Sequence, residues 1–256
     1  MVLVLAEIGS NHLGKLTKAK ELIDIAYECG ADVAKFQWID RGRIWDKPHS
    51  RPKWTELPFT FIWDCYQYCE KLGIEFMCTP TAPEHVTLLN PMVSRWKIAS
   101  SHVNDHELCE EVFETEKPIF ASTGLLTPRE VWKVQKWATP LHCVVKYPSM
   151  PQDYALQDWV TEAGLLRSPE HPSYPEWGIS DHSIGIGTSI AAVALGASVV
   201  EKHIALSQQP RSPDDGPHAL RPTALKAFIS GIRQAESARD GIRPEAIVPN
   251  GRVVWV

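Results

Sequence analysis

Residues 178–204 read GISDHSIGIGTSIAAVALGASVVEKHI, and this stretch contains one complete strand–helix–strand unit. Apolar strand patterns at Gly178–His182 and Ser198–Ile204 flank a helical pattern at Ile184–Leu195. Two strands separated by a helix are typical of neighbouring parallel strands with a crossover connection. The stretch therefore predicts a parallel α/β sheet.

The same alternation continues on both sides of this unit. The other strand–helix pairs are expected at Leu3–Ile8 with Leu16–Cys29, Asp32–Trp38 with Phe59–Leu72, Ile74–Thr79 with Pro83–Leu89, Arg95–Ser100 with Asp105–Thr115, Pro118–Ser122 with Pro128–Ala138, and Leu141–Tyr147 with Tyr154–Leu166. A last helix is expected at Thr223–Arg239. Eight such units in 256 residues match a barrel, which needs about 250 residues. We therefore predict one α/β domain over residues 1–256, a single (β/α)8 TIM barrel.

An open, doubly wound sheet is the alternative architecture. It would place a glycine-rich turn after the first strand. Residues 7–14 read EIGSNHLG, which has two glycines but not the G-x-G-x-x-G spacing of that turn. The barrel is therefore the preferred prediction.

Composition argues against several classes of protein. The net charge of -5 disfavours general nucleic-acid binding, which needs a basic balance. Every apolar run is shorter than the roughly 20 residues of a membrane span, and the first seven residues lack the basic segment of a signal peptide. The six cysteines form no CxxC pair, as expected for reduced thiols. We expect a cytoplasmic protein with no nucleic-acid or membrane partner.

Polar side chains occur where the predicted strands end. The active site of a barrel lies at the carboxyl ends of its strands. The residues at these ends are Glu7, Lys35, Gln37, Thr79, Lys97, Ser100, Ser122, Tyr147, Ser180, His182, Glu201 and His203. A barrel end without a site would carry mostly Asn, Gly and Asp turn residues. The pattern therefore predicts an active site at this end.

His182 and His203 end the last two predicted strands, which are neighbours in a barrel. Residues two apart on a strand lie on the same face, so Ser180 and His182 share one face of their strand, and Glu201 and His203 share one face of theirs. Two converging imidazoles with open positions for water and substrate suit a Lewis-acid metal. Two core histidines that orient loops are the alternative interpretation.

Lys35 and Lys97 are expected to point into the same end of the barrel. With nearby hydroxyl groups they would bind a doubly anionic ligand, because lysine supplies charge and hydroxyls supply directed hydrogen bonds. Either lysine could instead be a Schiff-base nucleophile, or form an ion pair with Glu7 or Glu201. The residues alone leave these alternatives open.

Nine short motifs resemble, in order, those of the sialic acid synthase family. They are AEIGSNHLG at 6–14, AKFQ at 34–37, CTP at 78–80, WKIAS at 96–100, STG at 122–124, HC at 142–143, YP at 147–148, SDH at 180–182 and EKH at 201–203. The resemblance implies an aldol-type condensation of phosphoenolpyruvate with an N-acetylmannosamine-like amino-sugar aldehyde. The products would be a nonulosonic acid and phosphate.

The resemblance also implies roles for residues. A manganese or magnesium ion held by His182 and His203 would polarise the sugar aldehyde. The residues that match the phosphoenolpyruvate site are Lys35, Thr79, Lys97, Ser100, Ser122 and Ser180. Those that match sugar and metal-proximal positions are Glu7, Gln37, Tyr147, Glu201 and Asp214. Family members commonly form dimers, so a homodimer is expected.

Three residues depart from the family pattern. His102 replaces a carboxylate that steers the attacking water, and an imidazole can act as a base near neutral pH. We expect catalysis to involve Glu7, Lys97, His102 and Glu201. Val145 replaces a polar phosphate ligand, and strand alternation directs the neighbouring Lys146 away from the site. An apparent one-residue insertion at 211–217 displaces Asp214 from the family register.

The family's C-terminal antifreeze-like domain, which caps a partner's site, has no counterpart in the 256 residues. The long segment 39–58 is therefore expected to close the site, through Arg43, His49 or Trp54. Other functions consistent with the sequence are a Schiff-base aldolase using Lys97 or Lys35, a non-catalytic barrel that binds a sugar or partner, and a metal-dependent hydrolase.

Overall fold

The computed structural model describes residues 1–43, 51–164, 176–206, 212 and 214–241, and the backbone of 246–247 and 253–254. His49 lies outside the described residues. Two strands near the end of the chain, β9 (Ala246–Ile247) and β10 (Val253–Val254), form a separate antiparallel pair. The barrel elements lie within residues 3–240.

Eight parallel strands form one sheet in the order β3-β2-β1-β8-β7-β6-β5-β4. Their bounds are β1 Leu3–Gly9, β2 Val33–Trp38, β3 Glu75–Pro80, β4 Trp96–Ile98, β5 Ile119–Ser122, β6 Thr139–Cys143, β7 Gly178–Asp181 and β8 Val199–His203. The first and last strands, β1 and β8, are paired, and β3 packs beside β4. The sheet is therefore a nearly closed barrel, which confirms the predicted (β/α)8 architecture.

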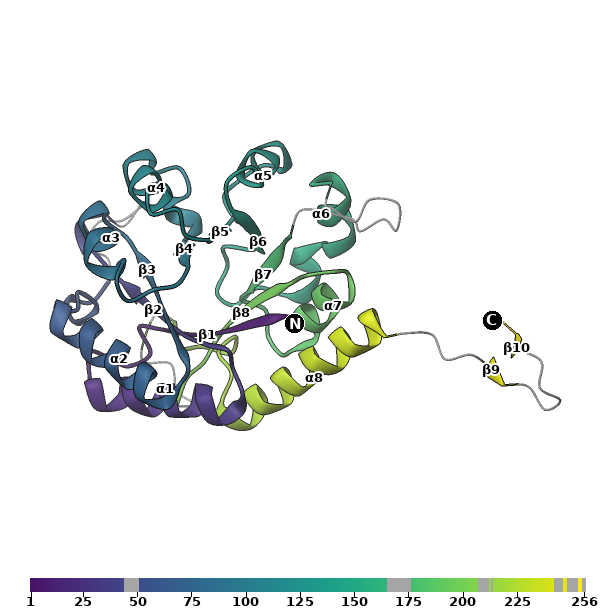
Figure 1. The fold of residues 1–256 in the computed structure, drawn as a ribbon, viewed down its shortest axis with the longest axis horizontal. Helices are drawn as coiled ribbons and strands as arrows, with labels where there is room; N and C mark the ends of the chain where they lie inside the picture. The colour runs from purple at the N-terminus through teal and green to yellow at the C-terminus, as the bar shows by residue number, and fades with distance from the viewer. Residues whose placement is uncertain are drawn as a thin grey trace.

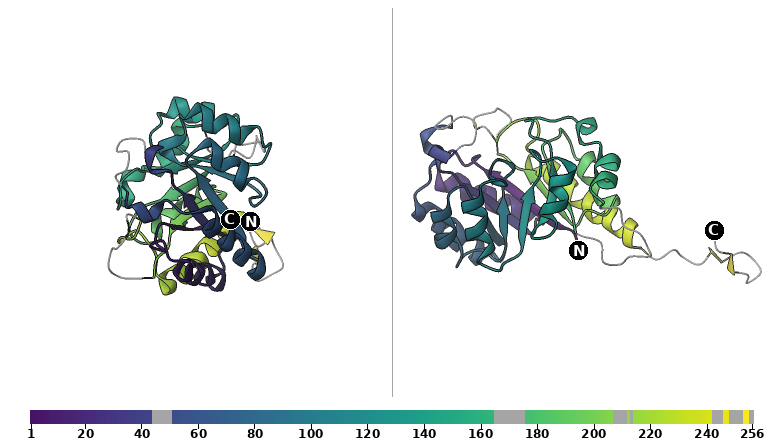
Figure 2. Two further views of the ribbon diagram at one scale, coloured as in Figure 1. Left: turned by 90° about the vertical axis from the view of Figure 1, so that its left-hand side faces the viewer. Right: turned by 90° about the horizontal axis from the view of Figure 1, so that it is seen from above.

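Helices surround the strands on the outside (Figures 1 and 2). Their bounds are α1 Leu16–Cys29, α2 Phe59–Leu72, α3 Pro83–Leu89, α4 His106–Phe113, α5 Pro128–Val134, α6 Leu156–Glu162, α7 Gly187–Ala194 and α8 Pro222–Asp240. Short 3-10 turns are η1 Arg41–Arg43, η2 Lys53–Thr55, η3 Ser100–His102 and η4 Pro151–Tyr154. Helices α1 to α3 have the predicted bounds. None of the helices in the described residues is long and apolar enough to cross a membrane.

Glycines in the left-handed region end α1 and α2. Gly30 has φ 87° and Gly73 has φ 77°, and the backbone N–H of each donates to carbonyls of the preceding turn. Glycine adopts this conformation without the steric cost of a Cβ atom. These two stop signals are readable in the sequence, which explains the accurate bounds.

Strand β6 ends four residues earlier than predicted. The backbone N–H of Lys146 donates to the carbonyl of Val144 in a tight turn, so the chain leaves the ladder after Cys143. Helix α5 is likewise shorter than predicted, because the chain turns after Val134, and α6 begins at Leu156 and ends at Glu162, while its predicted end at Leu166 lies outside the described residues. Tyr147 consequently lies on the loop after β6.

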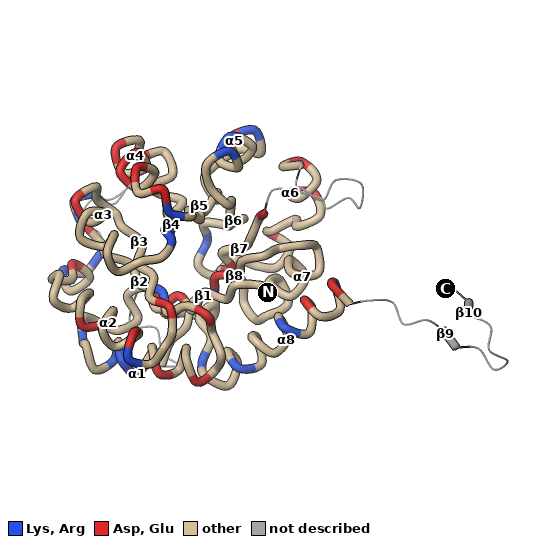
Figure 3. The backbone as a smooth tube through the Cα atoms, viewed as in Figure 1, with Lys and Arg blue, Asp and Glu red and all other residues tan. Residues whose placement is uncertain are grey.

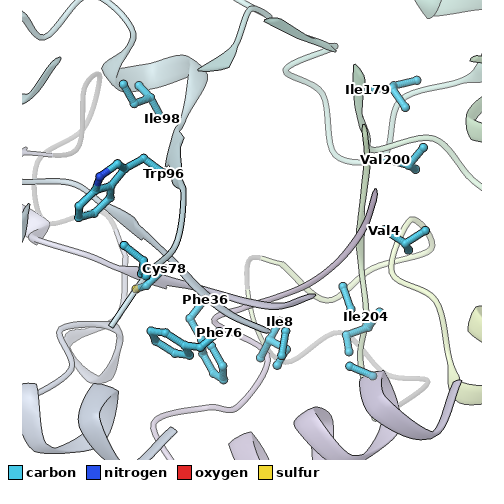
Figure 4. Close-up of a cluster of buried hydrophobic side chains, with 14 of the residues drawn as sticks. Val4, Ile8, Phe36, Phe76, Cys78, Trp96, Ile98, Ile179, Val200 and Ile204 are labelled. Atoms are coloured by element: carbon cyan, nitrogen blue, oxygen red, sulfur yellow. The ribbon is translucent and has the colours of Figure 1, made fainter. Parts of the chain in front are cut away.

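Alternation along the strands divides the barrel into two faces. Outward-facing residues such as Val4, Ile8, Phe36, Phe76 and Val200 pack in the main core under the helices (Figure 4). The lower interior of the barrel is filled by a second apolar cluster: Leu5, Val33, Met77, Phe120, Leu141 and Val199. Two residues further along, the same inward face carries a polar or charged group on five of these six strands and Cys143 on β6. The inside of the barrel is therefore apolar toward the amino ends of the strands and polar at their carboxyl ends.

Candidate active site

A cavity of about 460 Å³ opens at the carboxyl ends of the strands. The predicted site residues that line it are Lys35, Gln37, Thr79, Lys97, Ser100, His102, Ser122, Tyr147, Ser180, His182, Glu201 and His203. Charged residues occur in β2, β4 and β8 of the barrel wall as well as on the helices (Figure 3). Glu7 and Asp214 do not line the cavity themselves. Glu7 pairs with Lys35 and Asp214 pairs with Arg51, and both of these partners line it.

A buried ion network connects the two lysines to two carboxylates. Lys35 Nζ donates to Glu7 and lies 3.3 Å from Glu201 Oε2, while Lys97 Nζ lies 3.6 Å from Glu201 Oε1. Ser180 Oγ donates to Glu201 Oε1 at 2.7 Å. The structure thus shows the ion pairs that were one of the alternatives for the lysines.

The two carboxyl groups of this network, Glu7 and Glu201, have pKa values that are shifted in opposite directions. Burial raises the pKa of Glu201, but Lys35 and Lys97 outweigh it and hold this pKa well below its usual range. Burial raises the pKa of Glu7 to about 7, although Lys35 opposes the shift. Burial lowers the pKa of Lys97. Because Glu201 stays ionised while Glu7 titrates near neutral pH, Glu7 is the carboxyl group suited to proton transfer.

His182 and His203 converge, with ring centroids 5.5 Å apart. His182 Nδ1 donates to the Val144 carbonyl at 2.8 Å, so in the neutral ring the lone pair is on Nε2. Burial lowers the pKa of His182, but the neighbouring Cys143 outweighs it and raises this pKa above its usual value. His203 Nδ1 is buried without a hydrogen-bond partner in the described residues. Burial lowers the pKa of His203 well below its usual value, so the ring is neutral at pH 7.

These two rings fit a metal ion with two protein ligands. Bonds between a metal and imidazole are about 2.1 Å long, so rings at this separation can reach one ion. Within the described ranges, His, Cys, Asp and Glu side chains form no group of three or more placed to hold a metal. An ion bound here would therefore keep positions for water or substrate.

His102 lies on η3 between the main cavity and a second hollow of about 320 Å³. Its Nδ1 is 2.8 Å from Ser101 Oγ, and its buried Nε2 has no hydrogen-bond partner in the part of the chain that is described. Burial lowers the pKa of His102, so its ring is neutral at pH 7. A neutral imidazole with an unpaired nitrogen can accept a proton.

The segment that contains Arg51 contributes a residue that sequence reasoning missed. Arg51 lines the main cavity, and its Nη1 lies 3.2 Å from Asp214 Oδ2. Arg43 instead pairs with Asp105 beside the second hollow, and Trp54 lies against Gly14. Arg51 is therefore the arginine of this segment that reaches the cavity.

Three other neighbours of the site bear on the sequence predictions. Val145 lines the cavity, while Lys146 is exposed and binds Asp153, so Lys146 points away from the site as predicted, although both residues follow the end of β6. His218, which sequence reasoning missed, has its ring 5.2 Å from that of His203. Its place between the last strand and the last helix was the signal that could have identified it, since this loop joins the barrel mouth.

Comparisons with known proteins place these observations in a family. The model of the NeuB family matches residues 22–243. Pseudaminic acid synthase of Campylobacter jejuni is 31% identical over 93% of the chain and 74% of its own length. Human N-acetylneuraminate-9-phosphate synthase is 32% identical over 92% of the chain and 70% of its own length.

A solved structure shows the same fold. N-acetylneuraminic acid synthetase of Leptospira borgpetersenii superposes with a TM-score of 0.83 at 24% identity, covering 96% of the chain and 88% of that protein.

Proposed function

The chain belongs to the NeuB family, and we propose that it condenses phosphoenolpyruvate with an N-acetylmannosamine-like amino-sugar aldehyde to form a nonulosonic acid and phosphate. The family that the nine sequence motifs indicated is confirmed. The sugar, the metal and the roles of individual residues belong to the proposal.

Unpartnered hydroxyls beside the lysines carry the proposal. Thr79 Oγ1 and Ser122 Oγ are buried without a hydrogen-bond partner in the described structure, and both residues line the cavity with Lys35 and Lys97. A buried hydroxyl without a partner costs about 1–3 kcal/mol. Phosphate and carboxylate oxygens of a bound ligand would satisfy both groups, and the lysines would supply charge.

The charges in the site suit a metal-assisted reaction. Lys35, Lys97 and Arg51 face two ionised carboxylates, Glu201 and Asp214, and Glu7, whose pKa is about 7. Phosphoenolpyruvate adds a carboxylate and a phosphate of about −1.5 to −2 charge. A Mn²⁺ or Mg²⁺ ion held by His182 and His203 would offset this charge and polarise the aldehyde oxygen.

The proposed reaction forms one carbon–carbon bond and breaks one carbon–oxygen bond. Carbon 3 of phosphoenolpyruvate bonds to the aldehyde carbon, and Glu7 gives a proton to the resulting oxygen. His102 accepts a proton from water as the water oxygen adds at carbon 2. The bond between carbon 2 and the phosphate oxygen then breaks while the new hydroxyl on carbon 2 passes its proton to the departing phosphate, which leaves a 2-oxo acid. Glu201 stays ionised and holds Lys35 and Lys97 against the ligand.

A Schiff-base aldolase is the second candidate, and one observation favours it. Burial lowers the pKa of Lys97, which increases the neutral amine needed for attack on a carbonyl. Lys35 is less suited, because Glu201 and Glu7 outweigh burial and raise its pKa. Borohydride with pyruvate would inactivate such an aldolase and would leave a phosphoenolpyruvate-dependent synthase active.

The decisive test measures phosphate released from phosphoenolpyruvate with Mn²⁺ and a panel of amino-sugar aldehydes. Release is expected only with an aldehyde and metal present, and His182→Ala and His203→Ala should abolish it. His106→Ala, which changes an exposed histidine, is the matched control. Absence of release across the whole panel would refute the function, and full activity of either variant would refute the metal assignment.

Location and assembly are further parts of the proposal. All six cysteines are free thiols, which suits the reducing cytoplasm. A homodimer is expected from the family resemblance, and sedimentation of the purified chain measures it directly.

A further inference from the structure

Asp181 and Lys202 form an ion pair that the proposed reaction does not use. They are paired in register between β7 and β8, and they precede His182 and His203 directly in the sequence. Lys202 Nζ lies 3.1 Å from Asp181 Oδ2, and both side chains are fully buried. Adjacent residues of a strand point to opposite faces, so this pair lies behind the cavity, where Ser189 of α7 donates to Asp181 Oδ2 at 2.6 Å.

The backbones of the two histidines are held in different ways. His203 lies inside β8 and is in register with Glu7 of β1, so the hydrogen-bond ladder of the barrel fixes it. Strand β7 ends at Asp181, and His182 therefore lies one residue beyond its strand. The orientation of His182 depends on contacts from outside the ladder.

Tyr154 holds the backbone of His182 itself. Its hydroxyl accepts a hydrogen bond from the His182 N–H at 2.7 Å, and the residue is 1% exposed. On the other side, the His182 carbonyl accepts from the Ser149 N–H at 3.0 Å. The Tyr154 hydroxyl thus supplies the acceptor that a neighbouring strand would otherwise provide.

Lys202 holds the residue that follows His182 and connects it to β8. Its Nζ donates to the Ser183 carbonyl at 2.6 Å, while the Ser183 N–H donates to Asp181 Oδ1 at 2.7 Å. Both polar groups of the Ser183 backbone are therefore bound by members of the ion pair. Because Lys202 belongs to the strand of His203, it ties the segment after β7 to the strand that carries the other histidine.

We infer that Lys202 and Tyr154 are positioning residues, which hold the backbone around His182 so that its ring and that of His203 can bind one divalent metal ion. The ring centroids are 5.5 Å apart in this arrangement. The inference rests on the proposed function and adds the residues that set the metal affinity of the same site. Loss of groups that orient histidine ligands commonly lowers metal affinity about 10- to 100-fold.

A purely structural role is the alternative for the ion pair. Removal of one partner would leave the other charge buried and unpaired, which destabilises a protein whatever its site does. The test therefore removes both charges together, in the double variant Asp181→Asn with Lys202→Met. Asparagine can still accept from the Ser183 N–H, whereas methionine fills the space of lysine but donates nothing to the Ser183 carbonyl.

The experiment titrates the full chain with Mn²⁺ in the absence of substrates and follows the electron paramagnetic resonance signal of free Mn²⁺. The double variant and Tyr154→Phe should each bind Mn²⁺ about tenfold more weakly or worse. Their affinity for phosphoenolpyruvate in EDTA should stay within about twofold, because Lys35, Thr79 and Lys97 lie on β2, β3 and β4. At saturating Mn²⁺, kcat for phosphate release should approach that of the unchanged protein.

The matched control is Asp32→Asn with Arg233→Met at the amino ends of the strands. Asp32 Oδ2 accepts from the Val4 N–H at 2.7 Å, and Arg233 lies 2.8 Å from Asp32 and donates to the Val2 carbonyl. This pair makes the same kinds of contact with the backbone, but at the end of the barrel opposite the histidines. Its removal should leave Mn²⁺ affinity unchanged even where the melting temperature falls.

Unchanged Mn²⁺ affinity in a folded variant overturns the role of the residue changed in it, and so does an equal loss of affinity in the control. Thermal melting verifies folding, and Tyr154→Phe decides alone if the double variant does not fold. If the variants bind Mn²⁺ more weakly but no acceptor gives phosphate release, the inference stands and the proposed reaction fails. If the unchanged protein does not bind Mn²⁺, the inference and the metal assignment are both overturned.

Discussion

Replacing Glu201 by glutamine should destabilise the folded protein strongly, although the two side chains have nearly the same shape. Glu201 is 5% exposed, lies 3.3 Å from Lys35 Nζ and 3.6 Å from Lys97 Nζ, and accepts a hydrogen bond from Ser180. Removing one partner of a buried ion pair costs about 3–5 kcal/mol, because the remaining charge stays desolvated. For a chain of this size, that corresponds to a fall in melting temperature of roughly 6–20 °C.

Urea unfolding at pH 7, followed by the fluorescence of the ten tryptophans, measures the free energy of unfolding. Glu75→Gln is the matched control, since Glu75 pairs with the partly exposed Arg95 and such pairs contribute about 0–1 kcal/mol. A loss in Glu201→Gln no larger than in this control would refute the account of Glu201 as the counter-ion of two buried lysines.

The pH dependence of this loss provides a second check. Burial lowers the folded-state pKa of Lys97 below its unfolded value, so between these two values the unfolded chain binds more protons. Stability therefore rises with pH across that interval. Without Glu201 the interval widens, so the deficit of Glu201→Gln should shrink between pH 7 and pH 9.5. A deficit that does not depend on pH would show that desolvated lysine charge is not its cause.

Three further predictions follow from the unpaired groups of the site. Ser122→Ala should raise the KM for phosphoenolpyruvate about tenfold without lowering the melting temperature, because it removes a hydroxyl that has no partner in the ligand-free structure; a lower melting temperature would contradict this. The kcat/KM should fall on the acid side, where His102, whose pKa burial lowers, gains a proton, and above about pH 7, where Glu7 loses one; Glu7→Gln should remove the alkaline limb, and its persistence would exclude Glu7. Chelation by EDTA should stop phosphate release and Mn²⁺ should restore it, whereas unchanged activity in EDTA would refute metal assistance.

The arrangement of the site residues on the strands was predictable because it depends on local geometry. Successive side chains of a strand alternate, so Leu5 and Glu7 share the inward face, as do Val199, Glu201 and His203. Lys146 also points away from the cavity that Val145 lines, as the rule predicted, but both residues lie beyond the end of β6, so the turn there and not strand alternation sets their directions. Element bounds were accurate where glycine ends a helix, and less accurate at β6, where a turn without a strong residue signal ends the strand.

What the sequence determined by itself was the barrel, the family and the set of polar groups at one end of the strands, since all of these follow from short-range periodicity and local motifs. The tertiary structure alone decided how those groups pair. It placed Glu201 between two lysines and brought Arg51 to Asp214 across 163 positions of the chain. Such contacts depend on how loops pack over the barrel mouth, and long-range packing leaves no periodic signal in the residues that take part in it.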